Sequence, residues 1–297
     1  MPRWRRSAGT QAIEMSEENS SGGGSPLKAM VSFFTIWQQD ITQEDMDAME
    51  RKFYLAPVAG LFFSVLIIIE MIVLILLSRE VFFGSSAIMA IAVLATVYVG
   101  SRFIHFDGLT DFGDGMIVSG TQEDHVRALK DTLVGAGGLG VALIVTLASF
   151  SVYSYIGAYL IVLAAVAEVM VKNAMVVAAA YGKPGNGMAG RQVGLTDTGS
   201  AVHSTIISLV LGLVVGMIGL IAYNLLMGLN DAFFNIEIVL VCVVFGLVVS
   251  WAVGYLMARK SNEVFGMVNG DILGATNEIA RLFVVFFMAL AVSVFVW

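Results

Sequence analysis

The sequence predicts an all-α protein, a polytopic membrane bundle of about seven transmembrane helices with a cytosolic aspartate-rich site. Two observations support this prediction. Of the 297 residues, 58% are hydrophobic and only 13% are charged, which is far too apolar for a soluble domain. Apolar runs of about 20 residues, the length of a helix that crosses a bilayer, recur along the chain. We therefore expect a multi-pass protein of the cell membrane, with the lipid bilayer as its surroundings.

The first 27 residues differ in composition from the rest of the chain. They are polar and low in complexity, so we expect a disordered tail over 1–27 and the integral membrane domain over 28–297. The tail lacks the apolar core of a secretory signal. An interfacial helix is expected over 28–51. Its apolar face consists of Met30, Phe33, Phe34 and Trp37.

The expected spans carry few charges. Glu70 interrupts the first span, and Glu168 and Lys172 lie within the long apolar stretch that follows residue 132. Glu168 and Lys172 are spaced i, i+4 in the order that favours an ion pair, which would lower the cost of burying both charges. A glycine-rich loop is expected over 181–200. The seven spans are predicted at 54–77, 81–101, two within 132–200 separated by a turn near 151–157, 205–229, 238–258 and 271–297.

The distribution of basic residues predicts the orientation of the chain. Fourteen of the 16 Lys and Arg residues fall in the segments 1–53, 102–131, 182–202 and 259–281. The positive-inside rule then places the N-terminus and the candidate active site in the cytosol. No basic stripe is present that could bind nucleic acid, so nucleic-acid binding is not expected.

An acidic stretch, residues 105–115, is the most informative part of the sequence. Asp107, Asp111 and Asp114 are spaced i, i+4 and i+7 and share one face of a helix. Three carboxylates this close repel one another unless a cation lies among them, and all-oxygen ligands favour Mg²⁺ or Mn²⁺. The glycines among them would let a pyrophosphate approach the backbone. The alternative is an acidic, solvated loop between two spans.

Two further polar segments lie on the same predicted side of the membrane. Asp271 and Glu278 are spaced i, i+7 at the start of the last helix, where the pattern fits either a functional site or ordinary helix capping. Lys130 and Asp131 precede the glycines of 135–138, which could pack helices closely or admit a phosphate.

Together these segments resemble the cobalamin synthase family, adenosylcobinamide-GDP ribazoletransferase. The family's His-x-Asp-Gly-Leu-x-Asp-x-x-Asp-Gly pattern is met by residues 105–115, and its Gly-Asp-x-Leu-Gly-Ala-x-x-Glu pattern by 270–278. The family's Lys-Asp-Ser-Arg segment is met in part, with Thr132 and Leu133 in place of Ser and Arg. Its N-terminal Thr-Arg-x-Pro becomes Thr-Ile-Trp-Gln at 35–38, without the Arg and the Pro.

The resemblance implies a transfer reaction and roles for individual residues. A hydroxyl of α-ribazole, or of its 5′-phosphate, would attack the cobinamide-linked phosphorus of adenosylcobinamide-GDP and release GMP. Asp107, Asp111 and Asp114 would hold one or two Mg²⁺ ions, and Asp271 or Glu278 would complete the metal site or act as general base. The sequence leaves open whether the protein forms a homo-oligomer. The expected substrate-binding residues are His105, Lys130, Asp131, Lys172 and Asn277.

Three other functions match parts of the sequence. The nearest is another membrane Mg²⁺-dependent transferase acting on a pyrophosphate-activated substrate, of the CDP-alcohol phosphotransferase kind, although Asp111 and Phe112 stand where that pattern has Ala-Arg. A membrane prenyltransferase would show two Asn-Asp-x-x-Asp-x-x-x-Asp motifs, which the sequence lacks. A transporter could use the intramembrane charges, but it would show internal repeats, and none is evident.

Overall fold

A computed structural model of the chain describes residues 24–80, 85–229 and 236–295. Most of the predicted tail, 1–23, lies outside these residues, and α2 begins at Pro26. The described residues form helices and no strand, which confirms the all-α prediction. The elements are α2 (Pro26–Phe34), α3 (Gln43–Arg51), η1 (Phe53–Leu55), α4 (Ala56–Glu80), α5 (Ser86–Gly100), α6 (Ile104–Ile117), α7 (Gln122–Leu129), α8 (Ala136–Ile156), η2 (Gly157–Tyr159), α9 (Leu160–Tyr181), α10 (Gly187–Leu195), α11 (Thr198–Met227), α12 (Ile236–Val264) and α13 (Gly270–Phe295).

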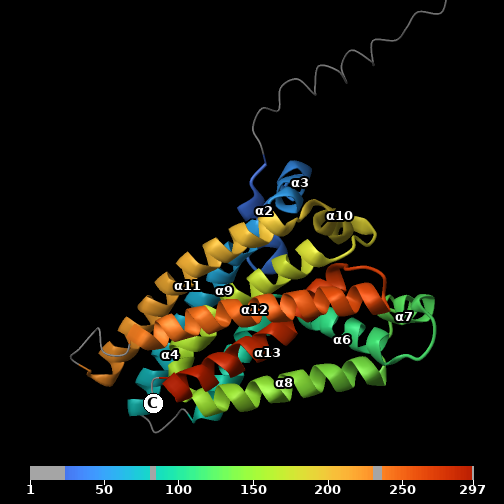
Figure 1. Ribbon diagram of the computed structural model, residues 1–297. Coiled ribbons are helices and arrows are strands. Elements are labelled where there is room, and N and C mark those ends of the chain that lie inside the picture. The colour runs from blue at the N-terminus through green and yellow to red at the C-terminus, as the bar shows by residue number, and fades with distance from the viewer. Residues whose placement is uncertain (1–23, 81–84, 230–235, 296–297) are drawn as a thin grey trace, which may run out of the picture.

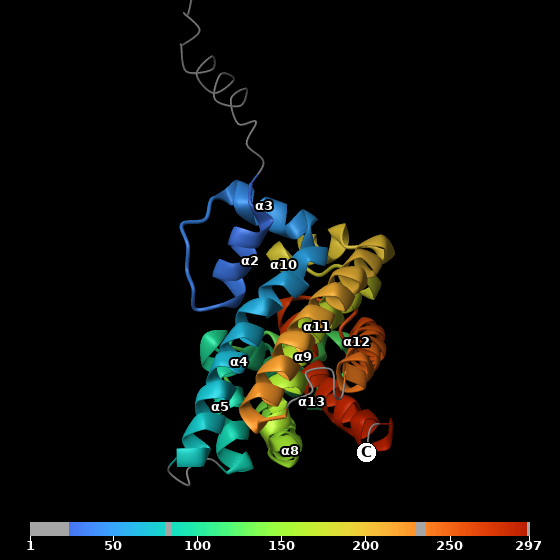
Figure 2. The same ribbon diagram turned by 90° about the vertical axis from the view of Figure 1, so that its left-hand side faces the viewer.

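Helix α9 forms the centre of the bundle. Every residue from 160 to 179 is buried, and α9 packs against α4, α11, α12 and α13. Figure 1 and Figure 2 show these helices around it. Alanine and valine dominate α9, and such small side chains let neighbouring helices approach closely on every side. A helix with apolar residues on every face, such as α9 with its few polar exceptions, is expected at the core of a bundle rather than at its surface.

The number of spans agrees with the prediction of about seven. Among the described residues, five helical stretches are long and apolar enough to cross a membrane, or six if the bent pair α5 and α6 is one span. One of the five is 46 residues long and comprises α8 and α9, which is about twice the length that one crossing needs. The chain reverses between these two helices at Gly157, whose φ is 61°. The chain after α9 is bonded to Val268, just before α13, and the start of α8 contacts α6, which crosses the start of α13, so α8 and α9 are two crossings.

A sharp break separates α5 from α6 and orients the acidic stretch. The two helices meet at 91°, and Arg102 and Phe103 adopt φ of 54° and 57°, which non-glycine residues rarely adopt. The Arg102 guanidinium donates hydrogen bonds to the carbonyls of Ser32, at 3.2 Å, and Phe33, at 2.9 Å. These bonds tie the break to the end of α2. Because of the break, α6 turns across the bundle and packs along α13 and α8.

Helices α2, α3 and α10 lie together at one end of the bundle (Figure 1; Figure 2). The Arg191 guanidinium of α10 pairs with Glu50 of α3 at 2.7 Å. The Asp45 carboxylate accepts hydrogen bonds from the backbone N–H groups of Thr42 and Ser25, which lower its pKa to about 2. Asp45 therefore fastens α3 to the start of α2.

Two predictions for this end of the bundle were wrong. The single interfacial helix expected over 28–51 is divided into α2 and α3, because Thr42 and Asp45 form a capping box that starts a second helix. Trp37 lies between the two helices, with 62% of its surface exposed. The glycine-rich loop expected over 181–200 contains helix α10.

Candidate active site

The site begins where α6 crosses α13. A Cβ atom built on Gly108 would lie only 2.6 Å from the carbonyl oxygen of Asp271, so the two backbones are in direct contact there. Gly274 of α13 also lies close to α6, since its Cβ would be 3.3 Å from the Cα of His105. The glycines of both acidic motifs therefore let the two helices approach each other. The expectation that glycines in 105–115 expose the backbone to a ligand was wrong for Gly108, Gly113 and Gly115, which pack against α13, α8 and Phe265.

The contact between α6 and α13 gathers four carboxylates. The negative charges of Asp271, Asp107 and Asp114 all act on the Asp111 carboxylate. Among the described residues, no group donates a hydrogen bond to the carboxylate of Asp107 or Asp111. Asp271 accepts a bond of 2.8 Å from the Asn269 amide and is acted on by the positive charge of Lys130. The site therefore holds an excess of negative charge, as a cation site requires.

The donor atoms of this site suit a hard divalent cation, because all of them are carboxylate oxygens. In the part of the chain that the structure describes, no three His, Cys, Asp or Glu side chains are already grouped around one metal position. Asp107 and Asp114 are seven residues apart, so they lie about 10 Å from each other along the helix axis. Asp111 lies between them in the sequence, and the negative charge of Asp271 acts on it.

Asp114 has a second set of contacts that the sequence did not suggest. Its two carboxylate oxygens accept the backbone N–H groups of Gly135 and Gly138, each at 2.7 Å. These N–H groups belong to the start of α8, where backbone donors have no partner within the helix. Asp114 therefore caps α8 from outside that helix. The glycines are required here, since a Cβ atom on either would lie within 2.6 Å of an Asp114 oxygen.

A cavity of about 190 Å³ lies beside the carboxylates. One wall carries the polar side chains of His105, Asp107 and Asp271, from α6 and α13. Helices α2 and α10 also line the cavity. The remaining side chains that line the cavity are Phe33, Phe34, Ile104, Met175, Met188, Ala189, Gln192 and Leu273. The cavity thus joins an acidic wall to an apolar, partly aromatic one.

A buried polar network extends from His105 into the bundle. The Lys172 ammonium lies 2.7 Å from His105 Nε2 and donates to Asn277 Oδ1 at 2.9 Å. The Asn277 amide donates to Glu278 at 3.0 Å, and Arg281 pairs with Glu278. All five side chains are at most 3% exposed. Lys172 and Asn277 therefore meet the site through His105, and Glu278 lies away from the four aspartates with both carboxylate oxygens bonded.

The ion pair predicted between Glu168 and Lys172 is not formed. Glu168 instead receives two hydrogen bonds from Arg281, at 2.7 and 3.3 Å. The guanidinium fork matches a carboxylate with two parallel donors, which a single ammonium cannot do. Sequence reasoning overlooked Arg281 as a partner. The sequence does indicate a buried partner for Arg281, because an isolated Arg within a predicted span needs an opposite charge close by.

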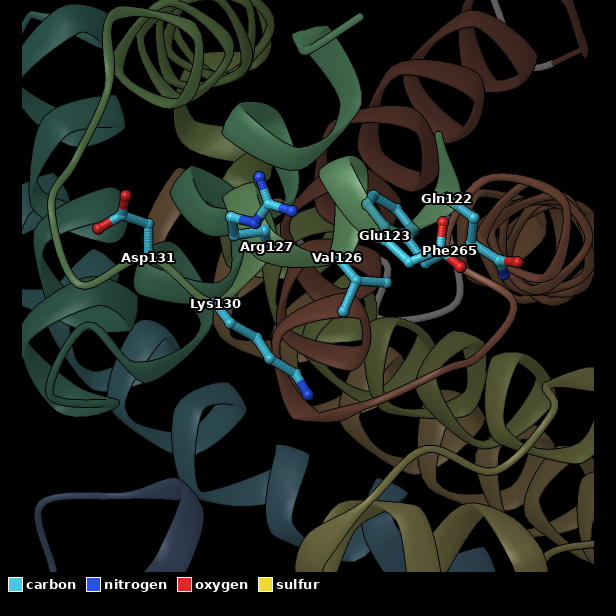
Figure 3. A pocket seen from close by; sticks show the side chains of 7 residues that line it. All are labelled: Gln122, Glu123, Val126, Arg127, Lys130, Asp131 and Phe265. Atoms are coloured by element: carbon cyan, nitrogen blue, oxygen red, sulfur yellow. The ribbon is translucent and has the colours of Figure 1, made fainter. Parts of the chain in front are cut away.

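Lys130 and Asp131 lie in a separate, open hollow on the surface. It measures about 680 Å³ and is lined by α7 and Phe265. Figure 3 shows the Lys130 and Asp131 side chains pointing away from each other within it. The Asp131 carboxylate accepts the backbone N–H of Leu133 at 3.0 Å. Of the two, Lys130 is the one whose charge acts on the aspartate site, through Asp271.

Comparisons with known proteins agree over most of the chain. A family model described as cobalamin-5-phosphate synthase matches residues 26–289. A protein of Methanosarcina mazei named adenosylcobinamide-GDP ribazoletransferase is 30% identical over 277 residues, which cover 86% of this chain and 88% of that protein. A protein of the same name from Methanococcoides burtonii is 28% identical over 280 residues, covering 90% and 92%. No solved structure matches the chain.

Proposed function

The chain belongs to the cobalamin-5-phosphate synthase family, and from this membership we propose that it joins adenosylcobinamide-GDP to α-ribazole or its 5′-phosphate. It is a multi-pass membrane transferase of cobalamin biosynthesis. The observation that carries the proposal is that both acidic motifs meet in space, where α6 and α13 cross beside a cavity. A site made of carboxylates beside a cavity suits transfer between a pyrophosphate and a hydroxyl.

The reaction exchanges one phosphate–oxygen bond for another. The acceptor hydroxyl oxygen bonds to the phosphorus attached to cobinamide. The bond from that phosphorus to the bridging oxygen breaks, and the bridging oxygen leaves with GMP. The hydroxyl loses its proton to a base. The products are adenosylcobalamin, or its 5′-phosphate, and GMP.

We assign the carboxylates two tasks. Asp107, Asp111 and Asp114 hold one or two Mg²⁺ ions, which when bound would neutralise charge on the phosphate oxygens. Asp271 accepts the hydroxyl proton, because it lines the cavity and faces the same site from the other helix. Glu278 is the weaker candidate for that base, since Arg281 and Asn277 already bond both of its oxygens.

The basic side chains bind or position the phosphates. His105 lines the cavity next to Asp107 and presents its ring to the substrate. Lys172 and Asn277 act on the substrate indirectly, by fixing the His105 ring from behind. Lys130 contributes positive charge from the open hollow at the edge of the site.

We further propose that the site and the N-terminus face the cytosol. The basic segments 102–131, 182–202 and 259–281 include or adjoin α7, α10 and the start of α13. Helix α10 and the start of α13 line the cavity, and His125 of α7 bonds to the Gly115 carbonyl of α6, so all three lie near the site. Nucleotides and Mg²⁺ are available in that compartment.

A transfer assay tests the proposal. Membranes that contain the chain receive adenosylcobinamide-GDP, α-ribazole and Mg²⁺, and the corrinoid products and GMP are separated by chromatography. We expect complete corrinoid and GMP in equal amounts, with formation abolished by a chelator and by Asp111→Asn. Absence of product from inserted, folded protein would contradict the transfer. Product formation that a chelator leaves unchanged would contradict the Mg²⁺ assignment alone.

A further inference from the structure

One buried polar side chain that lines the cavity lacks a hydrogen-bond partner. Gln192 of α10 lines the cavity and is only 5% exposed, and its Nε2 group is buried without a hydrogen-bond acceptor. A buried donor without an acceptor costs about 1–3 kcal/mol. An acceptor supplied by a ligand in the cavity would remove that cost. The position of Gln192 therefore points to a ligand atom that accepts a hydrogen bond.

The cavity wall around Gln192 favours a flat aromatic group. Phe33, Phe34, Met175 and Met188 all line the cavity, and aromatic rings and thioether sulfur atoms both contact ring systems favourably. Phe34 is held firmly, because its ring stacks on His105 with centroids 5.6 Å apart. The Lys172 ammonium lies 5.0 Å from the same ring.

The size and position of the cavity indicate which part of a ligand it takes. At about 190 Å³ it is smaller than the pockets of about 300–1,000 Å³ that hold whole small ligands, so it accommodates one fragment. Asp107 and Asp271 line the same cavity. A ring placed against the phenylalanines would direct the rest of the molecule toward these carboxylates.

The polar groups of the apolar wall limit the kind of ring. Gln192 offers an unpartnered NH2 group, which can donate but not accept, so it matches a base whose free ring nitrogen is an acceptor and which carries no donor of its own. A benzimidazole joined to ribose has this pattern. Guanine carries several hydrogen-bond donors and acceptors. In contact with the phenylalanines and methionines these groups would lose their hydrogen bonds to water without gaining new ones, which disfavours guanine in the cavity.

We propose that this cavity binds the base of the nucleoside acceptor, with Gln192 Nε2 donating to its free ring nitrogen. The assignment rests on the proposed function for the identity of the acceptor. Gln192 is thereby a residue that determines which base is accepted. It stands apart from the carboxylates, which act on the phosphate and hydroxyl groups.

The test compares two ribosides that differ at one ring atom. Benzimidazole riboside has the acceptor nitrogen, and indole riboside has a C–H group in its place. Equilibrium binding of each is measured on the full chain in lipid nanodiscs, for the wild type and for Gln192→Leu. We expect the wild type to prefer benzimidazole riboside about tenfold, and Gln192→Leu to bind both alike. Ser208→Ala, which removes a buried unpartnered hydroxyl on α11, should keep the wild-type preference.

Two outcomes would overturn the assignment. The first is a wild-type protein without preference between the ribosides, a result that does not depend on any variant folding. The second is a preference that persists in Gln192→Leu. Guanosine is also added as a competitor. If guanosine displaces benzimidazole riboside from the wild type and fails to do so from Gln192→Leu, the cavity belongs to the leaving nucleotide instead.

The transfer assay separates this inference from the proposed function. In that assay Gln192→Leu should raise KM for α-ribazole about tenfold and leave KM for adenosylcobinamide-GDP unchanged. Product formation without discrimination between the ribosides would overturn the subsite and leave the transfer intact. Discrimination without any product would overturn the transfer and leave the subsite intact.

Discussion

Replacing Gly108 by alanine tests the contact on which the site is built. The added Cβ would lie 2.6 Å from the Asp271 carbonyl oxygen, whereas ordinary contact begins at 3.4 Å, so α6 and α13 must separate by about 0.8 Å. Overpacking of this kind costs about 1–3 kcal/mol, and the better helix propensity of alanine returns up to about 1 kcal/mol. A misplacement of about 1 Å at a catalytic centre lowers the rate about 100-fold. We therefore expect a modest loss of stability and a large loss of kcat/KM.

The assay measures kcat/KM for transfer in membranes and the unfolding temperature of the purified protein. Gly140→Ala is the matched control, because this glycine also lies in a helix and a Cβ atom on it meets nothing within 4 Å. It should keep wild-type activity and gain up to about 1 kcal/mol of stability. A Gly108→Ala protein with wild-type kcat/KM would show that the close crossing of α6 and α13 does not set the geometry of the site.

Three further predictions concern the groups that hold the bundle together. Arg281→Met leaves the buried carboxylates of Glu168 and Glu278 without a counter-charge and should lower the unfolding free energy by about 3–5 kcal/mol. Adding Glu168→Gln and Glu278→Gln should restore most of this stability, and a triple variant that recovers none would contradict the ion-pair account. Asp114→Ala leaves two N–H groups of α8 without acceptors and should lower stability by about 1–3 kcal/mol, whereas an unchanged unfolding temperature would contradict the cap. The ionised Asp45 carboxylate should stabilise the α2–α3 segment fully above the unfolded pKa of about 3.9, with the contribution lost as the pH falls toward 2. Proteolysis of that segment should therefore increase over this range, and Asp45→Asn should remove the dependence; a variant with the same pH profile as the wild type would contradict it.

The membrane bundle could be predicted from sequence because composition and run length alone determine it. The break between α5 and α6 could not, since it depends on left-handed conformations at Arg102 and Phe103 that are tied to carbonyls of α2. Those carbonyls are about 70 residues away in the chain. Helix α10 was missed for a related reason. Its glycines favour a loop locally, and its contacts with α3 stabilise the helix.

The candidate site was predictable in its acidic residues and less so in its geometry. The spacing of the acidic stretch placed its aspartates on one helix face, and the resemblance brought Asp271 to them. Glu278 shares a face with Asp271, but seven residues correspond to about 10 Å along the axis, which carries it into the buried ion pairs. A shared helix face therefore does not ensure a shared site. Gln192 gave no signal in the sequence, because its significance comes from the cavity it lines.

The transfer rate of Asp271→Asn tests the central claim most directly, that the crossing of α6 and α13 is the catalytic centre. Asparagine keeps the size and the hydrogen-bonding oxygen of the side chain but can neither hold the negative charge nor accept the proton. The exposed Asp40, between α2 and α3, provides the matched control Asp40→Asn. We predict that Asp271→Asn inserts into membranes at the wild-type level and forms no complete corrinoid, while Asp40→Asn is fully active. Wild-type transfer by Asp271→Asn would contradict the claim and move the chemistry away from this crossing.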